Sequence, residues 1–194
     1  MEKRGFLFSY RMAITLCMIS ITFNIYGSTL LRSEYRTISR DCVIRLLKQR
    51  CFFDKYWNPS GDFKNQFESK TIDQDKVVID HATALMWHVS GSQEFVSLEG
   101  AKTWVAQLNK QEYAGSSDWR LPTLEEALSL LENEKKAHLY IDAVFDSRQW
   151  CIWTGDTLSD NLVWVVVFSG RVDWFDANVS FNYVRPVCRI VRAD

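Results

Sequence analysis

The sequence lacks the residue patterns on which many enzymes and metalloproteins depend. Its three histidines are scattered and its five cysteines include no Cys-x-x-Cys pair, so we expect no zinc site. It contains no Gly-rich phosphate loop, no Gly-x-Ser-x-Gly and no His-Glu-x-x-His. Asp80 and His81 are adjacent, but no second base or nucleophile accompanies them in a recognisable arrangement. We therefore expect no catalysis.

A strong charge of one sign is lacking as well. The 194 residues have a formal net charge of −1, whereas a polyanion binder would normally be basic, so we expect no nucleic-acid partner. The near-neutral total conceals a basic segment, residues 28–75, and an acidic one, residues 76–194. With only three prolines, the length fits one domain preceded by a modest N-terminal extension.

Long apolar runs are scarce, and the clearest one lies near the N-terminus. A basic start (residues 1–11) precedes the apolar run Met12–Phe23 and the small residues Gly27-Ser28. This order is typical of a secretory signal peptide over residues 1–27, which would make the mature protein secreted, periplasmic or cell-surface. An uncleaved membrane anchor through residues 6–26 and an ordinary buried helix are the alternatives.

Four cysteines remain after such a signal, and outside the cytosol they allow three pairings. A Cys151–Cys188 disulfide is favoured because both residues lie in strand-like segments. Cys42 and Cys51 would lie on opposite faces of one straight helix, so they pair only if the helix ends between them. Buried free thiols are the alternative.

Residues 28–75 form a lead-in to the main domain, residues 76–194. A helical pattern runs from Ser33 to Arg50 and is followed by an aromatic stretch around an Asn-Pro-Ser-Gly turn. We expect this lead-in to pack on the domain rather than to act as a flexible linker.

The main domain alternates short strands with helices, which predicts an α+β fold. Ser97 caps one expected helix, and the capping box Thr123-Leu124-Glu125-Glu126 begins a second and explains its carboxylates without catalysis. Strands are expected over residues 76–80, 84–87, 150–154, 162–168 and 183–191.

The run Asp118-Trp119-Arg120-Leu121-Pro122 precedes the second helix, and we interpret it as structural. Trp119 and Leu121 can be buried, and Pro122 starts the helix. Arg120 and Asp118 can tie the loop by charge-assisted hydrogen bonds.

Residues 171–183 are the segment most suggestive of binding. Aromatic anchors among short polar residues are the composition of a recognition surface. The alternative is a hairpin that buries half of its aromatic side chains. The candidate ligand-binding residues are Arg171, Asp173, Trp174, Phe175, Asp176, Asn178, Asn182 and Tyr183.

Several of these segments resemble the Lcl C-terminal domain family. Val77–Trp87 resembles its opening, Gly115–Ala127 contains its Trp-Arg-Leu-Pro-Thr run, and the later strand segments follow in the same order over residues 76–190. Ala84 stands where the family usually has glycine. If that position requires a positive φ, alanine costs roughly 1 kcal/mol there.

The resemblance implies a C-type lectin-like fold, in which two helices flank a small, mostly antiparallel sheet. It also implies a non-catalytic extracytoplasmic binding domain, such as an adhesin, with a glycan or protein ligand and no cofactor. In lectin-like folds the late strands and loops form the ligand face, which agrees with residues 171–183. The tryptophans in family motifs, Trp87, Trp119, Trp153 and Trp164, are expected in the core, which leaves Trp174 for binding.

The sequence leaves three alternatives open: a calcium-dependent site, a cysteine-dependent enzyme and a structural or sensor ectodomain. A calcium site could draw on Asp156, Asp160, Asp173, Asp176 and Asn178. The sugar-binding Glu-Pro-Asn and Trp-Asn-Asp motifs are absent, however, so we expect no metal. Formylglycine-generating enzymes have a related fold and use a reactive cysteine pair, for which Cys151 and Cys188 are the candidates. A structural or sensor ectodomain is the remaining alternative.

Overall fold

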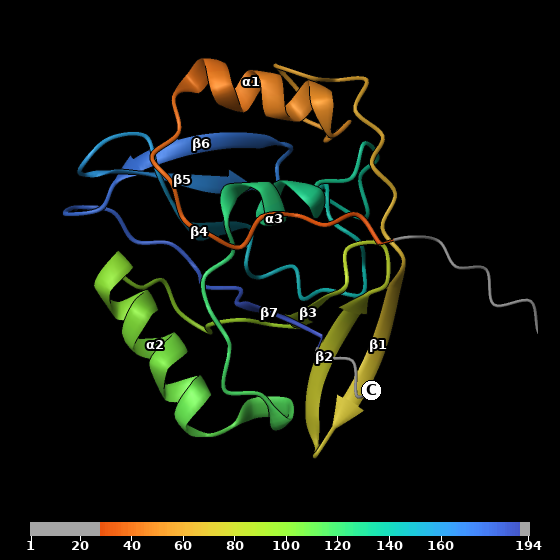
Figure 1. Cartoon of the computed structure of the whole chain (residues 1–194), viewed down its shortest axis with the longest axis vertical. Coiled ribbons are helices and arrows are strands. Elements are labelled where there is room, and N and C mark those ends of the chain that lie inside the picture. Colours follow the sequence, from red (N-terminus) through yellow and green to blue (C-terminus); the bar gives the residue numbers. More distant parts are fainter. Residues whose placement is uncertain (1–27, 191–194) are drawn as a thin grey trace, which may run out of the picture.

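The structure is a computed structural model that describes residues 28–190; the expected signal peptide lies outside them. Figure 1 shows an α+β arrangement of helices around two antiparallel sheets. The helices are α1 (Arg40–Gln49), α2 (Leu98–Lys110) and α3 (Leu124–Ser129), with a short 3-10 helix at Tyr113–Gly115. The strands are β1 (Phe67–Ile72), β2 (Asp75–Asp80), β3 (Leu85–His88), β4 (Cys151–Thr157), β5 (Leu162–Val167), β6 (Arg171–Asp176) and β7 (Val187–Arg189).

The first sheet has the strand order β1-β2-β3-β7. Strand β1 was not among the predicted strands, and it pairs with β2 through a turn in which Asp73 and Gln74 have φ values of 49° and 76°. Two positive φ values match the right-handed twist of a tight hairpin. This hairpin joins the lead-in to the main domain, because β1 lies within residues 28–75 and β2 runs from Asp75 into residues 76–194.

The second sheet has the strand order β4-β5-β6. The main domain therefore contains strands of two sheets, whereas a single small sheet was expected. The expected closing strand over residues 183–191 is also shorter, since only β7 forms a ladder there. Tyr183 instead makes a bridge to Ile152 of β4, and Pro186 has no N–H to donate. Residues 183–189 thereby pair with both sheets.

The caps of the two predicted helices are confirmed. The Ser97 Oγ accepts from the Gly100 N–H at 3.1 Å, and Thr123 and Glu126 form a reciprocal capping box. The helix expected from Ser33 is shorter, because α1 begins after its cap Ser39. Residues before Ser39 are extended, and the Ile38 N–H donates to the Thr157 carbonyl of β4 at 2.7 Å.

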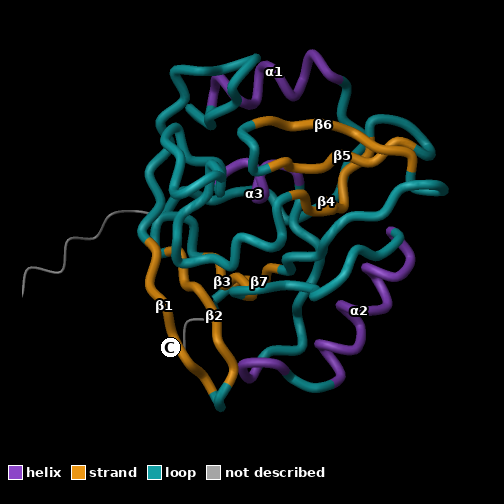
Figure 2. Tube along the Cα trace, turned by 180° about the vertical axis from the view of Figure 1, so that it is seen from behind, coloured by secondary structure: helices purple, strands orange, loops and turns teal. Residues whose placement is uncertain are grey.

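The lead-in supplies part of the hydrophobic core. Leu31, Val43, Leu47 and Phe52 are fully buried in the same cluster as Trp87 and Trp164. The motif tryptophans predicted to be core residues, Trp87, Trp119, Trp153 and Trp164, are all buried. Figures 1 and 2 both show α1 at the end of the molecule opposite to the tip of the β1–β2 hairpin.

Ala84 lies in the turn between β2 and β3 with a φ of 54°. This is the left-handed region that glycine adopts without strain, so the expectation from the family pattern is confirmed. Within residues 28–190, no helix is long and apolar enough to cross a membrane.

Candidate ligand-binding site

The predicted binding residues of β6 divide between the two faces of its sheet. Successive side chains of a strand point to opposite faces, so Trp174 and Phe175 are separated. Trp174 packs edge-on against Trp164, with 5.4 Å between ring centroids, in the cluster that contains the lead-in. Phe175 packs against the other cluster and lines a surface pocket. The candidate residues therefore do not form one surface.

The remaining candidates are placed separately as well. Tyr183 is buried and its backbone pairs with Cys151 and Trp153 of β4, so it lies in the packed interior; its role as a ligand contact stays a prediction. Arg171 pairs with Asp173 at 3.1 Å between Nη2 and Oδ2. Asp176 and Asn178 form a turn, in which the Asn178 N–H donates to the Asp176 Oδ1 at 2.8 Å.

Phe175 and Asn182 do share a pocket, together with Ser180 and Phe181 of the same segment and with Phe95 and Trp150, which lie outside it. We call it the aromatic pocket; it has a volume of about 430 Å³ and is lined by Phe95, Trp150, Phe175, Ser180, Phe181 and Asn182. Phe95, Trp150 and Phe181 are 43%, 44% and 61% exposed. Large aromatic side chains exposed together at a hollow mark binding surfaces more often than scattered ones do.

Other aromatic rings hold the wall of the aromatic pocket in place. The Phe95 ring lies over Tyr183 with 4.2 Å between centroids, and it meets Trp150 edge-on at 6.1 Å. Tyr183 thus supports the wall of the aromatic pocket. Because Phe95 precedes α2 and Trp150 precedes β4, only the tertiary fold brings them to Phe181.

Asn182 gives the aromatic pocket an unused hydrogen-bond donor. Its side chain is 3% exposed, and the buried Nδ2 has no partner among the described residues. Its backbone is fixed by reciprocal bonds to Val96, at 2.9 and 3.0 Å. Buried polar groups are normally hydrogen-bonded, so this unpartnered amide is an exception that the contacts of the described residues do not explain.

The run Asp118–Pro122 has the structural placement expected of it, with one correction. Trp119 and Leu121 are buried, and the Trp119 Nε1 donates to the Tyr113 carbonyl at 2.9 Å. Arg120 forms a bidentate pair with Glu126, at 2.7 and 2.6 Å, while Asp118 is exposed. Arg120 is tied to Glu126 rather than Asp118, because Glu126 on the first turn of α3 faces it.

The favoured Cys151–Cys188 disulfide is wrong in this structure, since both are free thiols. Cys151 lies on β4 and Cys188 on β7, which belong to different sheets. Burial raises the pKa of Cys151 to about 12 and that of Cys188 to about 11, so neither is an activated thiol. Cys42 and Cys51 are free and exposed.

The carboxylates considered for a calcium site are not gathered into a metal site within residues 28–190. No cluster of three or more His, Cys, Asp or Glu side chains could hold a metal ion there. Asp156, one of the calcium candidates, is bound by Arg32 instead. Arg185 and Arg189 donate to the backbone carbonyls of Asp146 and Leu31 respectively.

Comparison with known proteins identifies the main domain. Residues 76–188 match the Lcl C-terminal domain. Neither the curated proteins nor the solved structures yield a match to the chain. The matched residues span more than half of the chain and include the Trp-Arg-Leu-Pro-Thr run, the positive-φ position at Ala84 and all six residues that line the aromatic pocket. The chain belongs to the Lcl C-terminal domain family.

Proposed function

We propose that this protein is a non-catalytic binding domain of the C-type lectin-like class, which acts outside the cytoplasm and captures its ligand in the aromatic pocket. The observation that carries the proposal is the unpartnered Asn182 amide beside the exposed rings of Phe95, Trp150 and Phe181. An apolar pocket with a few placed polar groups is the common form of a small-ligand site.

The chemistry of the lining favours a neutral glycan over a charged ligand. None of the six lining residues carries a charge. A sugar ring presents an apolar C–H face that packs flat on an aromatic ring, and its hydroxyls accept from an amide donor such as the Asn182 Nδ2. Ser180 supplies a second hydroxyl partner at the same pocket.

Two features of the fold support the lectin-like assignment. The first and last described segments lie together, since Arg189 donates to the Leu31 carbonyl. Both segments also meet the β2–β3 turn, where the Thr29 N–H donates to the Ala82 carbonyl at 2.6 Å and the Ile190 N–H donates to the Ala84 carbonyl at 3.2 Å. The aromatic pocket also draws on the loop between β6 and β7, which corresponds to the late region that forms ligand faces in lectin-like folds.

The test compares exposed aromatic residues inside and outside the aromatic pocket. Trp150→Ala and Phe181→Ala should each lower glycan binding at least about tenfold, because both remove stacking area without opening the core. Tyr56→Ala is the matched control, since Tyr56 is 63% exposed and does not line the pocket. Trp174 and Tyr183 are unsuitable targets, because Trp174 packs against the buried Trp164 and Tyr183 is itself buried.

The screen uses the purified chain on an array of neutral and charged glycans together with a panel of peptides. Capture of neutral glycans, lost in Trp150→Ala and Phe181→Ala but kept in Tyr56→Ala, supports the proposal. Capture of peptides alone through the same residues would assign a protein ligand instead. Equal capture by all of these variants would place the ligand elsewhere and contradict the proposal.

A further inference from the structure

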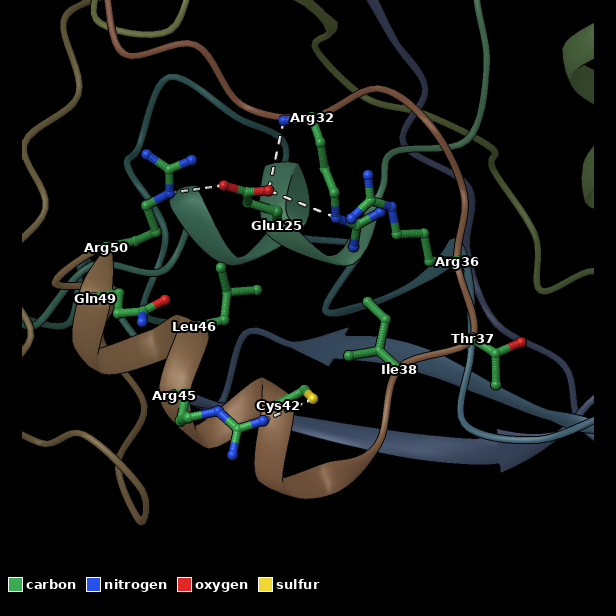
Figure 3. A pocket seen from close by; sticks show the side chains of 10 residues that line it. All are labelled: Arg32, Arg36, Thr37, Ile38, Cys42, Arg45, Leu46, Gln49, Arg50 and Glu125. Atoms are coloured by element: carbon green, nitrogen blue, oxygen red, sulfur yellow. Dashed lines mark hydrogen bonds and ion pairs between the residues drawn. The ribbon is translucent and has the colours of Figure 1, made fainter.

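A second cavity lies largely on the lead-in, outside the residues matched to the family. It has a volume of about 630 Å³ and is formed by the extended residues before α1, by α1 itself and by one residue of α3 (Figure 3). We call it the arginine pocket; the lining residues that matter here are Arg32, Arg36, Arg45, Arg50, Cys42 and Glu125. Its walls are thus strongly basic, although the whole chain is nearly neutral.

Two of these arginines are neutralised by buried carboxylates. The Arg50 Nε lies 2.8 Å from the Glu125 Oε1, and the Arg32 Nε lies 3.5 Å from the Glu125 Oε2. Arg32 also donates through both terminal nitrogens to the Asp156 carboxylate. Two carboxylates therefore balance two guanidinium groups, and the acidic residue in the wall leaves no negative charge to repel an anion.

Arg36 and Arg45 have no such partner. Neither forms an ion pair with any carboxylate of residues 28–190. Figure 3 shows them on opposite sides of the cavity, Arg36 from the extended segment and Arg45 from α1. Asp41 precedes Arg45 by one turn but does not line the cavity. Two uncompensated positive charges therefore face one hollow.

We propose that the arginine pocket binds a small organic phosphate monoester. A phosphate monoester carries a charge of about −1.5 to −2 at pH 7, which matches the two guanidinium groups that have no carboxylate partner, whereas a sulfate ester or a carboxylate carries only one charge. Guanidinium groups bind such oxyanions through paired hydrogen bonds. Ile38 and Leu46 provide an apolar wall for the organic part of the ligand.

Cys42 supplies a built-in reporter of occupancy. Its exposed thiol lies in the wall, 3.0 Å from the Arg45 Nη2. A hydrogen bond with Ser39 and the nearby charge of Arg45 lower the pKa of the Cys42 thiol, which favours reaction with alkylating agents. Cys51 is also exposed but does not line the pocket, so it serves as an internal reference.

The experiment measures binding of phenyl phosphate, phenyl sulfate and inorganic phosphate to the full chain at low ionic strength. Calorimetry gives the affinities, and mass spectrometry gives the rates of Cys42 and Cys51 alkylation by iodoacetamide. Phenyl phosphate should slow alkylation of Cys42 several-fold without affecting Cys51. It should bind at least about tenfold more tightly than phenyl sulfate and should weaken as salt is added.

Variants locate the site. Arg36→Gln and Arg45→Gln should each weaken phenyl phosphate binding about tenfold, as expected for the loss of a charged hydrogen bond. Arg148→Gln is the control, because Arg148 is exposed and bonds Gln93 outside the pocket. Absence of binding, equal binding of phenyl sulfate or inorganic phosphate, or indifference to both arginine variants would each overturn the proposal. The aromatic pocket shares none of these residues, so the two proposals fail independently.

Discussion

Arg32 and Asp156 form a two-pronged ion pair that fastens the lead-in to strand β4. The Arg32 Nη1 lies 2.9 Å from the Asp156 Oδ1, and Nη2 contacts Oδ2. The same buried carboxylate accepts from the Arg36 N–H and from the Leu124 N–H, each at 2.6 Å. One side chain thereby positions the extended segment before α1, the start of α3 and one wall of the arginine pocket.

Asp156→Ala should therefore destabilise the protein strongly. Removing one partner of a buried ion pair costs about 3–5 kcal/mol, because the other charge is left without compensation. The free energy of unfolding, measured by urea titration, should fall by that amount. Asp160→Ala is the control at an exposed site nearby, where a change within about 0.5 kcal/mol is expected. Similar losses for both variants would contradict this role of Asp156.

Ala84→Gly should stabilise the protein. The φ of 54° strains alanine but not glycine, so relief of roughly 1 kcal/mol is expected despite the greater entropy of glycine in the unfolded chain. Ala82→Gly, in the same turn but without a positive φ, should be neutral or destabilising. Thermal unfolding of both variants measures the difference, and a lower melting temperature for Ala84→Gly would show that φ is not the limiting factor.

His88 should make stability fall in mild acid. Burial, and then the charge of Arg185, lower the pKa of His88 from 6.5 to about 4, although Asp75 opposes the shift. Its Nδ1 accepts from the Gly91 N–H at 2.9 Å, which requires the unprotonated ring nitrogen. Between pH 4 and pH 6.5, His88 is therefore protonated in the unfolded chain but not in the folded protein. The stabilisation is thus complete above pH 6.5 and is lost as the pH falls to 4.

The loss attributable to His88 amounts to about 3 kcal/mol at most. Urea titrations across that pH interval measure it by comparing the wild type with His88→Gln, whose curve should be flatter. His81→Gln is the control, because His81 is exposed and pairs with Glu68 at the surface. Parallel curves for the wild type and His88→Gln would assign the acid sensitivity to other groups.

The thiols should react in a defined order. Cys42 and Cys51 are exposed and should be alkylated in the native state, with Cys42 reacting first. Cys151 and Cys188 should react only after unfolding, because both are buried and burial raises their pKa values. Peptide mapping after timed alkylation checks this order. Rapid native labelling of both buried thiols would instead favour the reactive pair of a formylglycine-generating enzyme.

Local patterns were sufficient for much of the main domain. Strand β2 and helices α2 and α3 follow from apolar periodicity and from the caps Ser97 and Thr123. Strand β1 has no such pattern, because its residues Phe67–Ile72 are mostly exposed at the sheet edge and are held by pairing with β2. The length of α1 was overestimated because bonds to Thr157 hold the preceding residues extended.

The candidate sites were harder to predict, because they too depend on tertiary contacts that leave no local pattern in the sequence. Phe175 and Asn182 could be identified from the composition of residues 171–183, but Phe95 and Trp150 reach the aromatic pocket only through tertiary structure. The arginine pocket had one sequence signal, the basic excess of residues 28–75. That excess does not reveal which arginines are neutralised, because Asp156 and Glu125 come from distant parts of the chain.

The Arg32–Asp156 pair also has a consequence for synthesis. Its partners are 124 residues apart, and Leu31 and Arg189 are 158 apart. The segment around Leu31 and Arg32 must therefore wait for the synthesis of Asp156 and Arg189 before it can dock. Until then Leu31, Val43 and Leu47 have no core to enter. Contacts of such long sequence separation slow folding, so this interval is when a nascent chain would most depend on a chaperone.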